Sequence, residues 1–352
     1  MNICNIKSIA AGLLVSVGVA TAASSAVAAQ ITGAGATFPA PMYTKWAETY
    51  KAQTGTLINY QPIGSGGGVK QIQAKTVDFG ASDDPVAAAE LEKSGLIQFP
   101  AVIGGVVPVV NIKGITPGQL KLNNATLSDI YRARITKWND PAIASVNPGV
   151  ALPDTPITLV YRSDSSGTTA VFTDFLSQVS PPFKGVVGSG KTVNWPAGVG
   201  GKGNAGVAAN VMKIDGAIGY VEYAYAKQNK MTHVSLINRD GKAVQPSEAS
   251  FGAAAAKANW AGTPNFAVNL NNQSGAASWP ITSATFILMY KNADKPVQSA
   301  EVLNFFNWAL TKGQKMAVDL DYVPLPDNAV KAIIKSWSAI KGPDGKPVFV
   351  AK

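Results

Sequence analysis

Residues 32–41 read TGAGATFPAP, a glycine-rich turn that leads into two prolines. Proline suits the first turn of a helix, because its φ is already helical and that position needs no N–H. We therefore expect a helix over 41–54, preceded by a turn that places the backbone amides of Thr37 and Phe38 at its N-terminus. The free N–H groups and the positive dipole end of such a terminus favour anions.

Two further turns of this kind lie along the chain, each after a short strand-like run. They are IGSGGGVK, residues 63–70, and RSDSSGTT, residues 162–169. Glycine lets the backbone approach a ligand closely, and Ser65 is suited both to cap a helix and to donate a hydrogen bond. One such turn is an ordinary strand-to-helix connection. Three of them, with the guanidinium of Arg162 beside the third, favour a cleft that binds an oxyanion.

Strand-like and helical stretches alternate along the rest of the chain, a pattern typical of an α/β fold with mostly parallel sheets. Two long apolar runs, 102–111 and 281–290, fit strands that cross between two lobes. Crossovers of this sort allow a cleft to close around a ligand. The predicted division is a discontinuous lobe 1, residues 29–105 and 285–352, and a lobe 2, residues 106–284.

The N-terminus has the pattern of a signal peptide. Lys7 precedes an apolar stretch over 9–20, and residues 26–28 read AVA, which fits the small-residue cleavage rule. We expect residues 1–28 to be removed on export to the periplasm. The only cysteine, Cys4, lies inside this segment, so the mature chain would contain no disulfide and no thiolate metal site. No later stretch reaches ~18 uninterrupted apolar residues, so no membrane span is expected.

The composition favours a globular protein of two domains, with 352 residues, 46% hydrophobic and 14% charged. The net charge is +9, yet no run of Lys and Arg resembles a nucleic-acid-binding arm. The excess suits either an anionic partner or a solvated basic surface. No nucleic-acid partner is expected.

One motif is misleading. Residues 185–192, GVVGSGKT, match the phosphate-binding P-loop of nucleoside triphosphatases, but such a loop follows a strand and opens a helix. Here two prolines lie just upstream, and we expect the glycine-rich stretch downstream, after Pro196, not to open a helix. No Ser/His/acid arrangement or metal-ligand spacing has positional support either. We therefore expect no enzyme activity, cofactor or metal.

Six strings, in order along the chain, resemble the PstS family of periplasmic phosphate-binding proteins: TGAGATFPAP, GSGGGVKQI, VDFGASDDP, RSDSSGT, GAIGYVEYAYAKQ and WPITSATFIL. The resemblance runs from about Thr32 to near the C-terminus. It implies the two-lobed type II periplasmic binding-protein fold. It also implies a monomer that binds inorganic phosphate between its lobes and delivers it to the transmembrane permease of an ABC importer.

The resemblance further implies which residues contact phosphate, and it pairs Asp164 with the binding arginine. By position the contacts fall on Thr37, Phe38, Ser65, Asp83, Arg162, Ser166, Gly167 and Thr168. Two positions depart from the family pattern. Gly66 stands where related sequences often carry a serine, and Asp84 is an additional acid beside Asp83.

Two of these roles have alternatives. The fork of Arg162 suits two phosphate oxygens with Asp164 behind it, but the pair also fits an ordinary surface ion pair. Asp83 is suited to accept a hydrogen bond from the proton that phosphate retains near neutral pH. Its position before Pro85 also fits a helix N-cap. The rival functions are a periplasmic phosphatase and a surface adhesion role that uses the same cleft.

Overall fold

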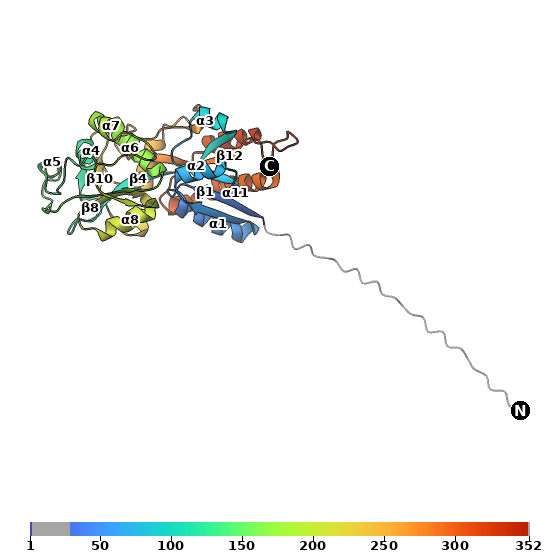
Figure 1. Ribbon diagram of the computed structural model, residues 1–352, viewed down its shortest axis with the longest axis horizontal. Helices are drawn as coiled ribbons and strands as arrows, with labels where there is room; N and C mark the ends of the chain where they lie inside the picture. Colours follow the sequence, from blue (N-terminus) through green and yellow to red (C-terminus); the bar gives the residue numbers. More distant parts are fainter. Residues whose placement is uncertain (2–28, 351–352) are drawn as a thin grey trace.

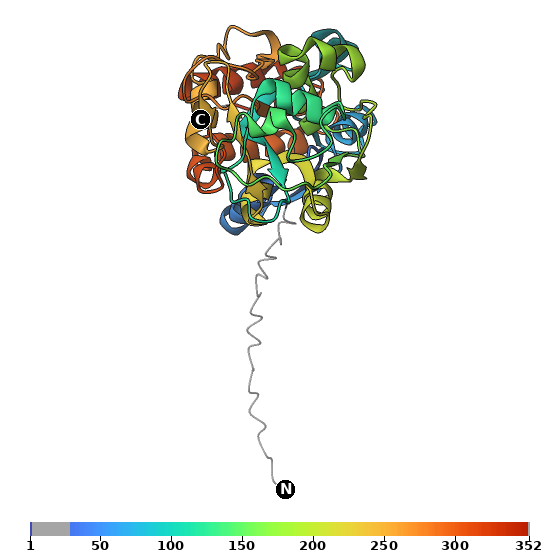
Figure 2. The same ribbon diagram turned by 90° about the vertical axis from the view of Figure 1, so that its left-hand side faces the viewer.

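The computed structural model describes Met1 and residues 29–350, so the predicted signal peptide lies almost wholly outside the described residues. The molecule is elongated, and elements from the middle of the chain occupy one end of its long axis (Figure 1). Seen from that end, these elements lie in front, and elements from both ends of the chain lie behind them (Figure 2). Among the described residues, no helix combines the length and the apolar character that crossing a membrane requires.

The main sheet has the strand order β2-β1-β3-β12-β4-β8-β6-β7, with β9 beside β4. We call the half around β1 the first lobe and the half around β8 the second lobe. The first contains β1 Gln30–Gly35, β2 Leu57–Pro62, β3 Phe79–Ser82 and β12 Thr282–Tyr290; the second contains β6 Thr158–Arg162, β7 Val199–Gly201, β8 Ala217–Glu222 and β9 Thr232–His233. A small sheet of the second lobe contains β5 Lys121–Leu122, β10 Ser235–Ile237 and β11 Ala243–Val244.

Helices pack on both halves of the main sheet. Those of the first lobe are α1 Ala40–Thr54, α2 Ser65–Gln73, α3 Ala88–Lys93, α11 Pro296–Thr311, α12 Gln314–Asp319 and α13 Asp327–Ser336 with the 3-10 turn η2 Trp337–Ala339. Those of the second lobe are α4 Asn124–Tyr131, α5 Pro141–Ala144, α6 Gly167–Val179, α7 Pro181–Val186, α8 Gly203–Lys213, α9 Tyr223–Gln228 and α10 Glu248–Ala255, followed by the 3-10 turn η1 Pro264–Phe266.

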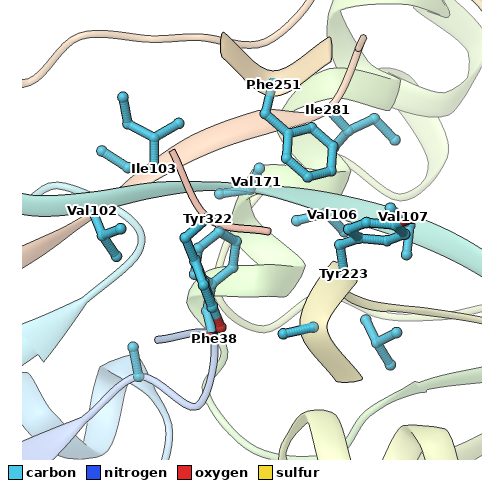
Figure 3. Packing of buried hydrophobic residues seen from close by; sticks show 14 of the residues in the cluster. Phe38, Val102, Ile103, Val106, Val107, Val171, Tyr223, Phe251, Ile281 and Tyr322 are labelled. Atoms are coloured by element: carbon cyan, nitrogen blue, oxygen red, sulfur yellow. Dashed lines mark hydrogen bonds between the residues drawn. The ribbon is translucent and has the colours of Figure 1, made fainter. Parts of the chain in front are cut away.

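The strand β4, Leu96–Val110, belongs to both lobes. Nine of its first ten residues pair with β12, with a register shift at Ala101, and Val106–Val110 pair with β8. The strand is apolar and buried along almost its whole length, as expected for a strand covered on both faces. Figure 3 shows side chains of both lobes, among them Phe38, Tyr223 and Tyr322, packed around it. One apolar core therefore continues through the connection between the lobes.

The expectation of mostly parallel sheets is wrong at the centre of the molecule. Parallel pairing in the main sheet is confined to β2-β1-β3 and β8-β6-β7. β12 is antiparallel to both β3 and β4, and β4 is antiparallel to β8. The reason is that β4 and β12 connect the lobes and are not successive strands of one β–α–β unit.

Candidate functional site

The three turns singled out in the sequence each connect a strand to a helix. They join β1 to α1, β2 to α2 and β6 to α6. α2 begins at Ser65, after Gly64 with φ 94°. A side chain at Gly64 would overlap the carboxylate of Asp164 in the other lobe, so this turn requires glycine for both conformation and space. In α6, Oγ of Ser166 accepts a hydrogen bond from the Thr169 amide at 3.0 Å and caps the helix.

The turns present backbone amides that are not used within the protein. Hydrogen bonds to other described residues are absent for the N–H groups of Thr37, Phe38, Ser65, Gly167 and Thr168. All five residues are buried. Buried N–H groups are almost always paired with an acceptor. These amides are therefore available to an acceptor that enters the site, as the sequence predicted for Thr37 and Phe38.

Arg162, at the end of β6, is held by its neighbours. Its Nε and Nη2 donate to Asp164 at 2.7 and 2.5 Å, and its Nη1 donates to Thr168 at 3.1 Å. The guanidinium side chain is 1% exposed, so the surface ion-pair interpretation is wrong. Burial alone would raise the pKa of Asp164, but the hydrogen bonds and charge of Arg162, with the Gly203 amide, hold that pKa below its usual value. A guanidinium has five N–H donors, and these contacts use three of them.

Asp83 follows β3 and faces the N-terminus of α6. Its Oδ2 lies 3.4 Å from Oγ of Ser65, and a side chain at Gly167 would overlap both groups. Its Oδ1 is buried and makes no hydrogen bond with the described residues. Burial raises the pKa of Asp83 to about 7, against the opposing influence of Thr285, Arg162 and Ser65. The N-cap interpretation is wrong, because the next helix, α3, begins at Ala88 with Ala87 at its N-cap position.

The sequence reasoning missed Asn204. The glycine-rich stretch after Pro196 does open a helix, α8, which begins at Gly203 after β7. The side-chain amide of Asn204 donates to Oγ1 of Thr37 at 2.7 Å and to Oγ1 of Thr168 at 3.2 Å. It therefore joins predicted contacts of the two lobes. The signal in the sequence is the string GGKGN, residues 200–204, a fourth glycine turn before a helix.

Other contacts bring the lobes together around these turns. The Gly66 amide donates to the Ser165 carbonyl at 2.9 Å, and Lys191 pairs with Asp84 at 2.5 Å. Lys191 belongs to the misleading loop motif, which here begins in the last two residues of α7 and opens no helix. Beside Asp83, a cleft of about 410 Å³ is lined by residues of both lobes. The additional acid Asp84 is thus a partner across the cleft.

The arrangement brings together the three turns, which carry seven of the eight predicted contacts, and Asp83, which follows β3. It offers unused amides, two unused N–H groups of a buried guanidinium and an unused carboxylate oxygen. Such a set suits a tetrahedral oxyanion that carries a proton. Within residues 29–350, no group of three or more His, Cys, Asp or Glu side chains is placed to hold a metal ion.

Comparison with known proteins identifies the family of the chain. The model of the PBP superfamily domain matches residues 20–312. The chain is similar to a phosphate-binding protein PstS of Pasteurella multocida, 54% identical over 96% of this chain and 98% of the relative. It is also similar to one of Haemophilus influenzae, 53% identical over 89% of this chain and 93% of the relative.

Among solved structures, the chain is similar to a human phosphate-binding apolipoprotein, with a TM-score of 0.71 and 22% identity over 87% of this chain and 94% of that one. At that identity the likeness shows the fold alone, and it confirms the predicted two-lobed α/β binding-protein fold. The family resemblance read from the six strings is confirmed by the PstS relatives. The chain belongs to the PstS family of phosphate-binding proteins, within the PBP superfamily.

Proposed function

We propose that this protein binds inorganic phosphate between its lobes and delivers it to an ABC-type importer. One observation carries the proposal: a buried arginine with unused N–H groups and a buried carboxylate with an unused oxygen lie around the same helix N-terminus, that of α6. The arginine and the amides favour an anion. The carboxylate favours an anion that still carries a proton, and phosphate keeps at least one near neutral pH.

Each predicted contact has a role in this proposal. The amides of Thr37, Phe38, Ser65, Gly167 and Thr168 donate to phosphate oxygens, with the hydroxyls of Ser65, Ser166 and Thr168 beside them. Arg162 donates its two remaining N–H groups, and Asp164 keeps its fork in place. Asp83 accepts the proton of phosphate. Neither a catalytic group nor a cofactor is needed, because binding and release complete the function.

We further propose that the mature protein acts in the periplasm as a monomer and docks on the transmembrane permease of the importer. The N-terminal pattern of a signal peptide supports the location. Energy for transport would come from ATP hydrolysis on another protein.

Closure of the lobes is part of the proposed function. We assign lobe 1 to residues 29–105 and 285–352 and lobe 2 to 106–284; the change of partner along β4 after Gly105 supports the first boundary. Phosphate should draw the lobes together, because its donors lie in both. Small-angle scattering should therefore show a smaller radius of gyration with saturating phosphate than without it. Identical profiles would contradict closure on the ligand.

Titration calorimetry with phosphate, sulfate and a phosphomonoester tests the function itself. We expect phosphate to bind at one site per chain and the other two to bind much more weakly. At a phosphate concentration of about 100 times Kd, the folded state should gain about 2.7 kcal/mol, visible as a higher melting temperature. Absence of phosphate binding would overturn the proposal, and turnover of a chromogenic phosphomonoester would favour a phosphatase.

A further inference from the structure

Three consecutive carbonyl groups of the first turn each accept a hydrogen bond from a tyrosine hydroxyl. Tyr60 in β2 donates to the Ala36 carbonyl at 2.7 Å, Tyr225 in α9 donates to that of Thr37 at 2.6 Å, and Tyr322 after α12 donates to that of Phe38 at 2.7 Å. The tyrosines come from three distant segments of the chain. In Figure 3, Tyr322 lies against Phe38, and their rings meet edge to face.

A hydrogen bond to a carbonyl also fixes the direction of the N–H in the same peptide group, because a trans peptide group is planar and its N–H points opposite to its C=O. The Ala36 carbonyl belongs to the same peptide group as the Thr37 amide, and the Thr37 carbonyl to the same group as the Phe38 amide. Tyr60 therefore orients the Thr37 N–H, and Tyr225 orients the Phe38 N–H. Neither N–H has an acceptor among the described residues. Tyr322 differs, because the next residue, Pro39, has no N–H to orient.

Tyr225 differs from Tyr60 in one respect: it comes from the second lobe, while Thr37 belongs to the first. The Thr37 carbonyl also accepts from the Ala40 amide within its own turn, but at 3.3 Å, the longer of the two bonds. The shorter bond joins the two lobes.

We infer that Tyr60 and Tyr225 are positioning residues for the anion, and that Tyr225 makes the Phe38 amide a full donor only in the closed state. This inference rests on the proposed phosphate binding. A carbonyl that accepts a hydrogen bond also polarises its own peptide group, which strengthens the N–H at the other end as a donor. Closure would in this way tighten binding through a residue that does not touch the anion.

The hydroxyls are suited to this task at neutral pH. Burial is the main cause that raises the pKa of Tyr60 well above its usual value, and it likewise raises the pKa of Tyr225. Both therefore stay protonated and remain donors.

The first test is Tyr225→Phe, which removes the hydroxyl and keeps the ring. We expect Kd for inorganic phosphate to rise about five- to tenfold. This is the effect of losing one hydrogen bond, the one from Tyr225 that orients the Phe38 amide toward the anion. The rise should come from a faster dissociation rate with an unchanged association rate, because encounter precedes closure. Tyr223→Phe is the matched control: it lies on the same helix, packs its ring against Phe251, and should leave Kd and both rates unchanged.

The second test reads the two amides separately by ¹⁵N–¹H NMR of the phosphate-saturated protein. Tyr225→Phe should move the Phe38 amide proton upfield and leave that of Thr37 in place. Tyr60→Phe should move the Thr37 amide proton upfield and leave that of Phe38 in place. This variant tests the same effect for a bond within one lobe. A Kd within twofold of the parent for Tyr225→Phe, or a shift that does not separate the two amides, would overturn the inference. Tight phosphate binding by the parent would still stand, so the two proposals fail independently.

Discussion

Replacing Arg162 with methionine should raise Kd for phosphate by about two to four orders of magnitude. Three of the five N–H groups of Arg162 donate to Asp164 and Thr168, and the variant loses the other two, which we expect to donate to phosphate. Charge-assisted hydrogen bonds contribute about 1.5–3 kcal/mol each, and about 1.4 kcal/mol is a factor of ten in Kd. Titration calorimetry at fixed ionic strength measures the change.

The single variant should also lose stability, since it leaves the carboxylate of Asp164 without its guanidinium. Loss of one partner from a buried pair costs about 3–5 kcal/mol. The double variant Arg162→Met with Asp164→Asn removes that charge and should recover most of the ligand-free melting temperature. Its phosphate binding should stay weak. If the double variant binds phosphate within threefold of the parent, Arg162 does not contact the anion.

At a pH well above 7, where Asp83 is ionised, replacing it with asparagine should raise the sulfate-to-phosphate affinity ratio by up to about three orders of magnitude. Sulfate has the shape of phosphate but no proton at neutral pH, so it would face the free Oδ1 of Asp83 with lone pairs only. Two like unit charges ~4 Å apart at an effective dielectric of about 20 repel by about 4 kcal/mol. The value is an upper limit, because the charge of sulfate is spread over four oxygens. Competition titrations with both anions give the ratio.

Asp84→Asn is the matched control, with the same charge change at the next residue. Asp84 pairs with Lys191 across the cleft, so loss of its charge should weaken the binding of both anions alike. The sulfate-to-phosphate affinity ratio should stay within about threefold of the parent's. A ratio that is unchanged in Asp83→Asn, or that moves equally in both variants, would contradict the role of Asp83.

The same carboxyl sets a pH dependence whose sign follows from its raised pKa. With a pKa of about 7, Asp83 of the ligand-free protein takes up a proton as the pH falls through 7. That proton must leave before the carboxylate can accept one from phosphate. As the pH is lowered below 7, the affinity for phosphate should therefore decrease by up to about tenfold per pH unit. In Asp83→Asn, the affinity for phosphate should show only the pH dependence that the ionisation of phosphate itself causes.

Local sequence signals predicted much of the fold and of the site. Proline before α1, glycine before α2 and serine at the cap of α6 act through the conformation of a few neighbouring residues. The turns they form lie where the sequence places them, and α1 begins one residue from the predicted start. The family strings carried the remaining site residues, Asp83 and Asp164 among them.

The tertiary structure alone decided which groups are used and which are free. Asn204 and Tyr225 reach Thr37 from 167 and 188 residues away, and Tyr322 reaches Phe38 from 284 away. No local pattern marks such pairs, because they exist only when two lobes built from separate segments are packed together. The direction of β12 and the raised pKa of Asp83 have the same origin. By itself the sequence determined the strand-to-helix turns and their donors, since these depend on backbone conformation over a few residues. Packing of the lobes decided where those donors point, because orientation and burial depend on every segment around them.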